Sequence, residues 1–443
     1  MLKIAYLVQD FPPETGAGPA RVTEMARTWL EAGAQVTVVT GMPNRRLPGL
    51  PDGVIHPDYR GRYFHEEEWQ GIRVLRSWLF ATPRRGFMWT LANNASFMVT
   101  AAAHALAKVG RPDVLIASSP PFFVHLAGET VRLLRRVPLV LEIRDLWPDY
   151  LVQMGMLRNR LAQQSLFATE RYLLRRAAHS IVVTDSFKSR VIQKGVAPER
   201  VDVIPNGVDT NFYRPVTAPP PIQPLDRRSE RELVVGYLGT FGAGQALSAV
   251  IEAAVMVQKV NPDIRFVLAG DGPDRVRVVE RARVLNATNV EFHPPIPKES
   301  TPAFYAHCDV LLVPLAEIPI FQETIPSKIF EIMACERPVL ASLRGEGARI
   351  TEASGGGHVV PPEASEDIAA GVLRLFAFSK EERASMGRRG RDYVSRHFSR
   401  QVLADRYLEI LASLAGVSGR MPAPNAAPRP ILAEEEARAA NIE

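Results

Sequence analysis

Short runs of apolar, largely β-branched residues recur along the whole chain and alternate with segments long enough for helices. The runs are nearly continuous rather than alternating in polarity, which is typical of strands covered on both faces of a parallel sheet. Strands that alternate with helices in this way predict βαβ units and an α/β fold of doubly wound parallel sheets. The expected strands are Ile4–Val8, Val36–Thr40, Val114–Ala117, Leu139–Ile143, Ile181–Thr184, Val201–Ile204, Leu233–Leu238, Ile264–Leu268, Val290–Phe292, Val310–Val313 and Val339–Ala341.

A proline-dense stretch over residues 214–225 separates two such series of strands. Proline fixes φ and lacks a backbone donor, so this stretch fits neither a helix interior nor a central strand. We therefore expect one α/β domain over residues 1–205 and a second over residues 206–387. Residues 388–416 are expected to form a helix that packs back across the first domain, and residues 417–443 a disordered tail.

Composition narrows the class of protein. The chain has 443 residues, a net charge of +5 and two cysteines, Cys308 and Cys335. This charge is too small to indicate a nucleic-acid binder, although it fits an anionic substrate or an anionic membrane surface. The cysteines form no disulfide framework or zinc motif, and this favours the reducing cytosol as the location of the protein. No run of about 20 apolar residues predicts a spanning helix.

The first candidate site is the segment over residues 11–20, between the first expected strand and a helix. Gly16 and Gly18 would let backbone N–H groups approach a phosphate at the start of that helix. The spacing also fits an ordinary strand–helix turn. The third glycine and the downstream acidic residue of the dinucleotide fingerprint are absent.

The second candidate site is the segment over residues 321–331, where Pro326 and Ser327 predict the start of a helix. The positive end of that helix and the charge of Lys328 would attract a phosphate. Glu331 lies one turn into the helix, within reach of ribose-type hydroxyls, and Glu323 lies before it, within reach of a sugar. A capped surface helix with dispersed charges would give the same pattern.

The third candidate site follows the expected strand Leu139–Ile143. Arg144, Asp145 and Trp147 stand at its carboxyl end, where ligands bind in open α/β sheets. An Arg–Asp pair beside a Trp could bind a sugar by hydrogen bonds and stacking. A salt-bridged turn with the Trp in the core is an equally good interpretation.

Together these sites resemble the family-4 retaining glycosyltransferases of the glycosyltransferase-B fold. The resemblance runs from about Lys3 to about Ser413 and is nearest to enzymes of O-antigen, capsule and colanic-acid assembly, including fucosamine-transferase-like ones. It implies two Rossmann-like doubly wound domains that face a cleft. The stretches that carry it are Phe11-Pro12-Pro13-Glu14, Ser119-Pro120-Pro121, Arg144-Asp145-Leu146-Trp147-Pro148, Ile204-Pro205-Asn206-Gly207-Val208-Asp209, Gly270-Asp271-Gly272-Pro273 and Pro326-Ser327-Lys328-Ile329-Phe330-Glu331.

The resemblance implies a nucleotide-sugar donor, usually a uridine diphosphate sugar, in the second domain. By position, Glu331 would bind the ribose, Glu323 the transferred sugar, and Lys328 with the Ser327 N–H the diphosphate. The remaining donor-binding residues implied are Gly16 and Gly18 over the phosphates, Gly239 to Gln245 as the first loop near the diphosphate, and His293 beside the base.

The mechanism implied is sugar transfer with retention at the anomeric carbon. No metal ion or other cofactor is expected, because no DxD-type aspartate cluster occurs at a suitable position. One departure from the family concerns charge. Many relatives place a cation in the loop that here reads Gly239 to Gln245, which has none. Lys328 would then be the main local cation, helped by Arg21 or Arg144.

The acceptor is expected on the first domain. The resemblance implies a polyprenyl-diphosphate-linked or other glycan, at the inner face of the cytoplasmic membrane. Arg144, Asp145 and Trp147 are the acceptor-side residues, and His125 joins them or is a core histidine. The basic and apolar segment Arg84–Trp89 is the membrane candidate, while the apolar stripe over Leu91–Val109 fits packing on the sheet. Residues 43–70 are expected to be a long irregular insertion that covers the acceptor.

Two other functions remain open on the sequence. A nucleotide-sugar epimerase would share the architecture and the donor pocket but would need no acceptor. A non-catalytic scaffold that binds a nucleotide sugar would explain the loop without a cation, although Glu323, Lys328 and Glu331 argue against it.

Overall fold

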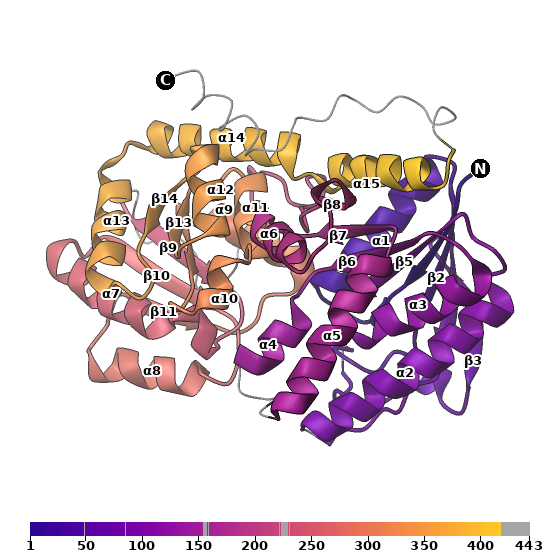
Figure 1. The fold of residues 1–443 in the computed structure, drawn as a ribbon. Coiled ribbons are helices and arrows are strands. Elements are labelled where there is room, and N and C mark those ends of the chain that lie inside the picture. Colours follow the sequence, from indigo (N-terminus) through magenta and orange to yellow (C-terminus); the bar gives the residue numbers. More distant parts are fainter. Residues whose placement is uncertain are drawn as a thin grey trace. The chain divides into compact units, whose positions relative to one another are not determined.

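The computed structural model describes residues 1–417 except Pro48, Arg85, 154–156, 158, 221, 223–228 and 230. The expected tail and much of the proline-dense stretch therefore lie outside the described residues. The chain divides into two compact units. The amino-terminal unit holds Met1–Asn206 and the segment from Arg400, and the carboxyl-terminal unit holds Gly207–Ser399 (Figure 1).

The amino-terminal unit is built on an eight-stranded sheet of order β3-β4-β2-β1-β5-β6-β7-β8. All neighbours pair in parallel except β3, which runs antiparallel to β4. The strands are β1 (Lys3–Leu7), β2 (Gln35–Gly41), β3 (Phe64–Trp69), β4 (Ile72–Ser77), β5 (Val114–Ser119), β6 (Leu139–Ile143), β7 (His179–Val182) and β8 (Val201–Val203).

Helices cover both faces of this sheet, which gives two apolar cores. One core joins the sheet to α2, α3, α5 and α6, and the other joins it to α1 and α15. The helices of this unit are α1 (Ala17–Glu31), α2 (Phe87–Lys108), α3 (Phe123–Arg135), α4 (Trp147–Gln153), α5 (Arg160–Arg176), α6 (Asp185–Gln193) and α15 (Arg400–Leu414).

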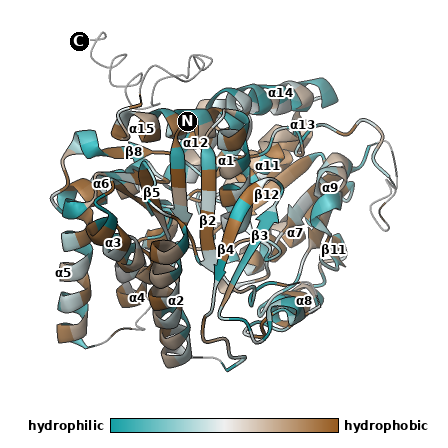
Figure 2. Ribbon diagram, turned by 90° about the vertical axis from the view of Figure 1, so that its right-hand side faces the viewer, coloured by the Kyte–Doolittle hydropathy of each residue, from teal (hydrophilic) through white to brown (hydrophobic). Residues whose placement is uncertain are grey.

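The carboxyl-terminal unit has a six-stranded, wholly parallel sheet of order β11-β10-β9-β12-β13-β14. Its strands are β9 (Leu233–Leu238), β10 (Ile264–Ala269), β11 (Val290–His293), β12 (Val310–Pro314), β13 (Val339–Ser342) and β14 (Gly357–Val360). Brown, apolar stretches on the strands of the molecule are visible in Figure 2, as expected for strands buried between helices.

The sheet of this unit shares its main core with α7, α8 and α13, and α14 packs against both α11 and α12. The helix α14 begins with a capping box, in which the Ser379 hydroxyl accepts from the Glu382 N–H and the Glu382 carboxylate accepts from the Ser379 N–H. The helices are α7 (Leu247–Val260), α8 (Arg275–Val284), α9 (Thr301–His307), α10 (Pro319–Gln322), α11 (Ser327–Ala334), α12 (Glu346–Ser354), α13 (Ser365–Ala377) and α14 (Lys380–His397).

The structure confirms the α/β class and the expected strands, with shifts of a few residues at their ends, and corrects two expectations. The segment over residues 43–70 is not wholly irregular, because Phe64–Trp69 forms the edge strand β3. The single helix expected over residues 388–416 is two helices. The first, α14, belongs to the carboxyl-terminal unit, and the second, α15, belongs to the amino-terminal unit.

Candidate functional site

The strand order of the carboxyl-terminal unit locates its candidate ligand site. The chain builds β9 first, adds β10 and β11 on one side, and then returns to add β12 on the other. Loops that leave neighbouring strands in opposite directions open a crevice at the carboxyl ends, which is where open α/β sheets bind ligands. The segments over residues 239–246 and 315–328 follow β9 and β12 at this position.

These two loops are joined by direct contacts. The backbone N–H of Ala316 donates to the carbonyl oxygen of Gly244 at 3.0 Å. A Cβ atom on Gly244 would lie 2.8 Å from the Phe321 ring, so glycine permits the close approach. The next loop adds Gly270, where a Cβ atom would lie 1.8 Å from the carbonyl oxygen of Gly239. At Gly244 and Gly270 the packing of these loops therefore leaves no room for a side chain.

Lys328 lies in the first turn of α11, beside the loop after β9. Its Nζ lies 4.4 Å from the centre of the Tyr237 ring and 3.5 Å from the Oε1 of Gln245. A Cβ atom on Gly239 would lie 2.6 Å from the same Nζ. Desolvation lowers the pKa of Lys328 to about 8, and Glu331 opposes this shift. The amino group thus reaches the loop in which the sequence places no cation.

Glu331 and Glu323 occupy different positions around α11. Glu331 lies in the second turn of the helix, where the buried Tyr305 hydroxyl donates to its Oε2 at 3.2 Å. Glu323 lies outside α11, directly after the short helix α10. Ser327 is the first residue of α11. The N-cap position is occupied by Pro326, whose side chain has no atom that could accept a hydrogen bond from the helix. The expected helix start is confirmed, and the first-turn N–H groups have no side-chain cap from that residue.

His293 is the last residue of β11, at the carboxyl edge of the same sheet. Its Nδ1 lies 3.1 Å from the carbonyl oxygen of Pro294. The structure therefore brings Gly239, Gln245, Ser327 and Lys328 to neighbouring loops, with His293 two strands away from β9.

In the amino-terminal unit, the expected glycine segment lies after β1, next to the point where the strand order reverses between β1 and β5. Gly16 has a φ of 127° directly before α1, a conformation that residues with side chains rarely adopt. A Cβ atom on Gly18 would lie 2.6 Å from a guanidinium nitrogen of Arg144. The first and third candidate segments of the sequence thus meet, and Arg144 is held there by a 3.1 Å bond from its Nε to the carbonyl oxygen of Ser119.

Arg21 is not the helper cation that the sequence suggested. Its side chain is fully buried, and its Nε and Nη2 lie 3.1 and 3.0 Å from the Oε1 of Glu142. It also donates to the carbonyl oxygens of Ile204 and Pro205. Burial alone would raise the pKa of Glu142, but Arg21, Arg144 and hydrogen-bonding hydroxyls hold it below its usual range. The charge of Arg21 is therefore used inside the fold.

His125, Asp145 and Trp147 line one small cavity of about 10 Å³ beyond β5 and β6. His125 is buried, its Nε2 lies 3.3 Å from the carbonyl oxygen of Glu142, and desolvation lowers its pKa to about 4. Asp145 reaches solvent, yet the protein around it raises the pKa of its carboxyl, with Arg144 opposing the rise. The set is thus one exposed carboxyl above a neutral, buried histidine.

Two family models match the chain in succession. A model described as a glycosyl transferase 4-like domain matches residues 16–207, and one described as glycosyl transferases group 1 matches residues 223–393. Their boundary falls close to the division between the two units. The chain belongs to the family-4 glycosyltransferases. This confirms the resemblance drawn from the sequence motifs.

Relatives of this glycosyltransferase include one that is named for colanic acid biosynthesis. It is 24% identical to the putative colanic acid biosynthesis glycosyl transferase WcaI of Escherichia coli, over 91% of this chain and 98% of that protein. It is 23% identical to the probable glycosyltransferase WbjE of Pseudomonas aeruginosa, over 70% of this chain and 76% of that protein.

Solved structures show the same glycosyltransferase-B fold. The glycosyltransferase aligns with Anabaena HepE in complex with UDP and glucose at a TM-score of 0.66 and 20% identity, covering 93% of this chain and all of that one. It aligns with sucrose-phosphate synthase from Thermosynechococcus elongatus at a TM-score of 0.68 and 21% identity, covering 94% of this chain and all of that one.

Some partners in the sites of this glycosyltransferase were not found from the sequence. Tyr237 faces Lys328, Tyr305 holds Glu331, and Glu142 pairs with Arg21. Each pair joins residues far apart in the chain, and a tyrosine or glutamate inside an expected strand or helix carries no local signal of such a contact. Only the position of Glu142 near the carboxyl end of an expected strand could have indicated its contact with Arg21.

Proposed function

We propose that this glycosyltransferase moves a sugar from a nucleotide diphosphate sugar, a UDP-sugar, to a polyprenyl-diphosphate-linked or other glycan acceptor, with retention at the anomeric carbon. The pathway proposed is bacterial surface polysaccharide assembly. The name of WcaI and the UDP in the HepE complex support the pathway and the nucleotide. The observation that carries the proposal is the placement of Lys328 beside the loop after β9.

The chemical problem of the reaction is the leaving group. The bond between the anomeric carbon and the diphosphate oxygen breaks, and the electron pair stays on the diphosphate. Preorganised cations and N–H dipoles lower the energy of such a developing charge. Lys328 supplies a full charge, and the N–H groups of Ser327 and the first turn of α11 supply dipoles. Lys328 thus takes the role that a cation in the loop over residues 239–245 plays in many relatives.

The other residues follow from their positions. Glu331, fixed by Tyr305, accepts from the ribose hydroxyls, and Glu323 accepts from hydroxyls of the transferred sugar. The acceptor hydroxyl attacks the anomeric carbon from the face that the diphosphate leaves, and its proton passes to the departing phosphate oxygen. A side-chain base is then not required, and the transfer proceeds without a metal ion.

The amino-terminal unit is proposed to bind the acceptor through Arg144, Asp145 and Trp147. Asp145 accepts a hydrogen bond from the attacking hydroxyl and orients it, while desolvation raises the pKa of its carboxyl and Arg144 opposes the rise. His125, buried and bonded to the main chain, supports the loop from below.

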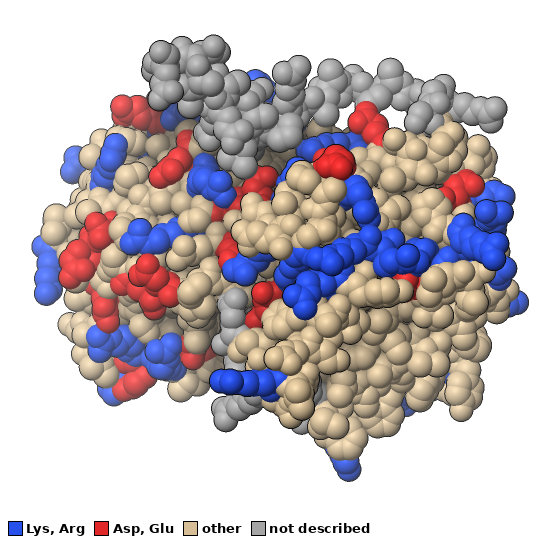
Figure 3. Space-filling view, in the orientation of Figure 1, with Lys and Arg blue, Asp and Glu red and all other residues tan. Residues whose placement is uncertain are grey.

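The outer helices of this unit support a peripheral membrane contact. Figure 3 shows a broad uncharged face over α2, α3 and the first half of α5, bordered by a blue band at the carboxyl ends of α3 and α5. On α2, Met88 and Val99 are 67% and 61% exposed, and no Asp, Glu, Lys or Arg occurs over residues 87–107. Exposed cations in the second half of α5 and at the end of α3 are Arg136, Arg171, Arg175 and Arg176.

An uncharged face that carries exposed apolar side chains such as Met88 and Val99 and is edged by cations suits the surface of an anionic bilayer. The Arg84 guanidinium lies 5.0 Å from the centre of the Trp89 ring, which adds a cation and an aromatic side chain at the start of α2. Within the described part of the chain, no helix has the length and apolarity needed to span a membrane. We place the enzyme in the cytoplasm, at the inner face of the cytoplasmic membrane.

The first experiment is calorimetric titration with UDP, GDP, ADP and their sugars, on wild type, Lys328→Ala and Lys259→Ala. Lys259 is an exposed cation at the end of α7 and is the matched control. We expect one diphosphate to bind, Lys328→Ala to weaken it about 10-fold to 100-fold, and Lys259→Ala to bind as wild type. No binding by the folded wild type would contradict the donor site.

The second experiment separates transfer from the two other functions. Membrane extracts are supplied as acceptor with the donor that binds, and the anomeric configuration of the product is read by NMR. Loss of transfer in Glu323→Ala with donor binding retained supports the enzyme. Conversion of the donor sugar without acceptor would indicate an epimerase, and donor binding without any turnover would indicate a scaffold.

A further inference from the structure

A cavity lies in the carboxyl-terminal unit, away from the loops just discussed. It has a volume of about 480 Å³ and opens at the amino-terminal edge of the sheet. Asp309 directly precedes β12, and Arg337 and Pro338 directly precede β13. The proposed donor site lies at the carboxyl ends of the same strands. Strands of this length span about 15 Å, so the two sites are on opposite edges of the sheet.

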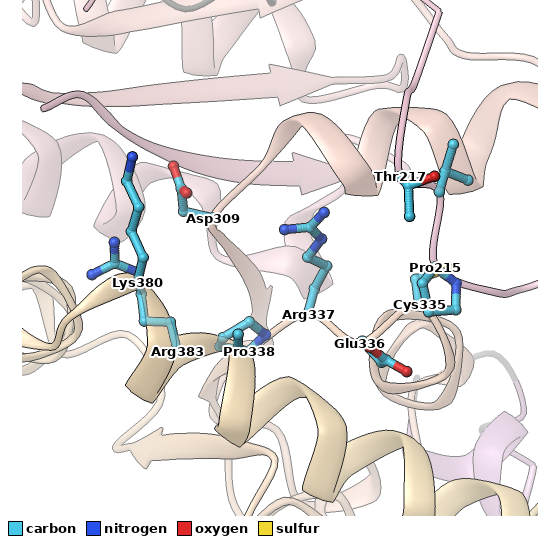
Figure 4. Close-up of a pocket in the computed structure, with 11 residues that line it drawn as sticks. Pro215, Thr217, Asp309, Cys335, Glu336, Arg337, Pro338, Lys380 and Arg383 are labelled. Carbon is cyan, nitrogen blue, oxygen red and sulfur yellow. The ribbon is translucent and has the colours of Figure 1, made fainter. Parts of the chain in front are cut away.

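Three cations line this cavity. Arg337 comes from the turn between α11 and β13, and Lys380 and Arg383 come from the first turn of α14. Figure 4 shows Arg337 extending between the Lys380, Arg383 and Asp309 side on the left and Pro215 with Thr217 on the right.

Arg337 is the unusual member of the group. Its Nε is buried and has no hydrogen-bond partner in the described part of the chain. The neighbouring Glu336 is directed to Arg391, with an Nε–Oε1 distance of 3.7 Å. Buried guanidinium nitrogens normally have a partner, because an unsatisfied one costs free energy. Arg337 also lines the cavity, so its guanidinium group can meet an oxyanion bound there.

Two other charged side chains of the cavity, Arg383 and Asp309, have partners that fix their positions. Arg383 donates through Nη1 to the carbonyl oxygens of Leu375 and Phe376 at the end of α13. The Oδ2 of Asp309 accepts from the Val234 N–H at 2.9 Å. The start of α14 is capped by Ser379, so the attraction for an anion comes from side chains rather than from free helix N–H groups.

The wall opposite α14 is also held in place. The carbonyl oxygen of Tyr213 lies 3.3 Å from the Nη1 of Arg391, and that of Pro220 lies 2.8 Å from the Nε2 of His307. These two contacts flank Pro215, Val216 and Thr217, which line the cavity. A preformed wall is what small-molecule sites of this size usually have.

We propose that this cavity binds the phosphate group of a small phosphorylated metabolite, of sugar-phosphate size. The planar fork of Arg337 matches two phosphate oxygens, and Lys380 adds a point charge. The volume exceeds that of a bare phosphate and lies in the range of small-ligand sites. Asp309 and the Thr217 hydroxyl lie on the cavity wall, where they can accept from or donate to the polar body of the ligand.

The test uses the full chain and calorimetric titration with glucose 6-phosphate, inorganic phosphate and glucose. The variants are Arg337→Gln, Lys380→Gln and the control Arg388→Gln. Arg388 is a half-exposed cation of α14 that pairs with Glu381 and does not line the cavity. Each titration is repeated with saturating UDP, which separates this site from the proposed donor site.

We expect glucose 6-phosphate to bind more tightly than about 1 mM, and glucose not to bind. Arg337→Gln should weaken binding at least about 10-fold without lowering the Tm, since it removes a buried nitrogen that has no partner. Lys380→Gln should weaken it less, and Arg388→Gln should not change it. Tighter binding of inorganic phosphate than of the sugar phosphate would assign the site to the free ion and overturn the sugar-phosphate assignment.

Three results would overturn the proposal. They are no binding of glucose 6-phosphate to wild type, binding to both Arg337→Gln and Lys380→Gln as tight as to wild type, and displacement of glucose 6-phosphate by UDP. The last would place the phosphate in the donor site. Because UDP binding is measured separately, failure here leaves the proposed transferase function standing, and the reverse also holds.

Discussion

At the scale of single residues, Lys328 supplies the main positive charge of the proposed donor site. Its amino group sits against the Tyr237 ring and has a pKa of about 8. This value lies close to physiological pH, so the charge that is proposed to meet the diphosphate is itself sensitive to pH. A bound dianion would favour the protonated amine and raise its pKa.

This predicts a specific pH dependence of UDP binding. Affinity should be highest near pH 7, where Lys328 is largely protonated and the diphosphate is ionised, and should already be reduced about two-fold at pH 8, where half of the amine is neutral. Above about pH 8 it should fall further, by up to about 10-fold per pH unit, because binding must then take up a proton. Calorimetry across this range measures the effect, and Lys328→Gln should show weak binding without the fall. An equal slope in the variant would assign the dependence to another group.

A second residue-scale prediction concerns the buried pair of Arg21 and Glu142. Glu142→Gln leaves the Arg21 guanidinium in the core without its counter-charge and should lower the free energy of unfolding by about 3–5 kcal/mol. The matched variant Glu66→Gln removes an exposed partner of Arg73 and should cost less than about 1 kcal/mol. Urea unfolding of both variants compares them. Similar losses would contradict a structural role for the buried pair.

The Glu142 contribution also depends on pH. The folded protein holds the pKa of Glu142 below its usual value, so its stabilisation is present at neutral pH. It should be lost as the pH falls through that lowered value, and Glu142→Gln should flatten this part of the stability curve.

At the scale of elements, α2 has two faces that the sequence could not separate. Of the apolar stripe expected to pack on the sheet, Ala102 is buried and Met98, Leu106 and Val109 pack against the core, whereas Val99 is exposed. Met88 and Val99 are on the outer face and are equally apolar. Hydrophobic residues on both faces blur the helical period, so the outer face emerges only from the structure.

The outer face predicts binding to anionic vesicles. The double variant Met88→Gln, Val99→Gln should reduce co-sedimentation with vesicles that contain phosphatidylglycerol, by about 10-fold, because two exposed apolar side chains no longer enter the interface. Val276→Gln is the control, since Val276 is 82% exposed on α8 of the other unit. Equal loss in the control, or no binding by wild type, would contradict the membrane contact.

The same scale explains which elements the sequence revealed. Central strands such as β9 and β12 are buried along almost their whole length and form nearly continuous apolar runs in the sequence. The edge strand β3 has the sequence FHEEEW and alternates between exposed and half-buried positions. Charges on an edge strand discourage pairing with other chains, and they also hide the strand from a search for apolar runs.

The candidate sites divide in the same way. Pro326, Ser327 and Lys328 form a local pattern, so the start of α11 could be predicted. The Tyr305–Glu331 contact joins residues from α9 and α11, and nothing in either segment encodes the approach of the other. The prediction of a single helix near the end of the chain missed the break at Phe398 and Ser399. The chain passes there from one unit to the other, and no proline or glycine marks the break in the sequence.

At the scale of the whole molecule, the chain crosses between the units twice, after Asn206 and after Ser399. The return places α15 against α1. The Trp29 indole donates to the carbonyl oxygen of Ala404 at 2.9 Å, and its ring meets that of Tyr407 at 5.2 Å in an edge contact. The amino-terminal unit therefore takes part of its core from the other end of the chain.

This predicts the effect of ending the chain after Ser399. The truncated protein should lose protection from hydrogen exchange in α1 and β1, because the buried Trp29 and Met25 become exposed. Exchange in β9 and β10 should not change, because their core contains no residue of α15. Ending the chain after Val417 provides the control. Uniform loss of protection in both units would contradict the division.

The position of α15 late in the chain also determines when the amino-terminal unit can complete its core during synthesis. The ribosome makes the roughly 200 residues of the carboxyl-terminal unit before α15 emerges, which takes about 10–40 seconds at ordinary elongation rates. Throughout that interval the nascent amino-terminal unit carries the bare apolar side of α1, with Trp29 uncovered. The unit that begins first is thus finished last, and during that interval it presents a surface that chaperones recognise.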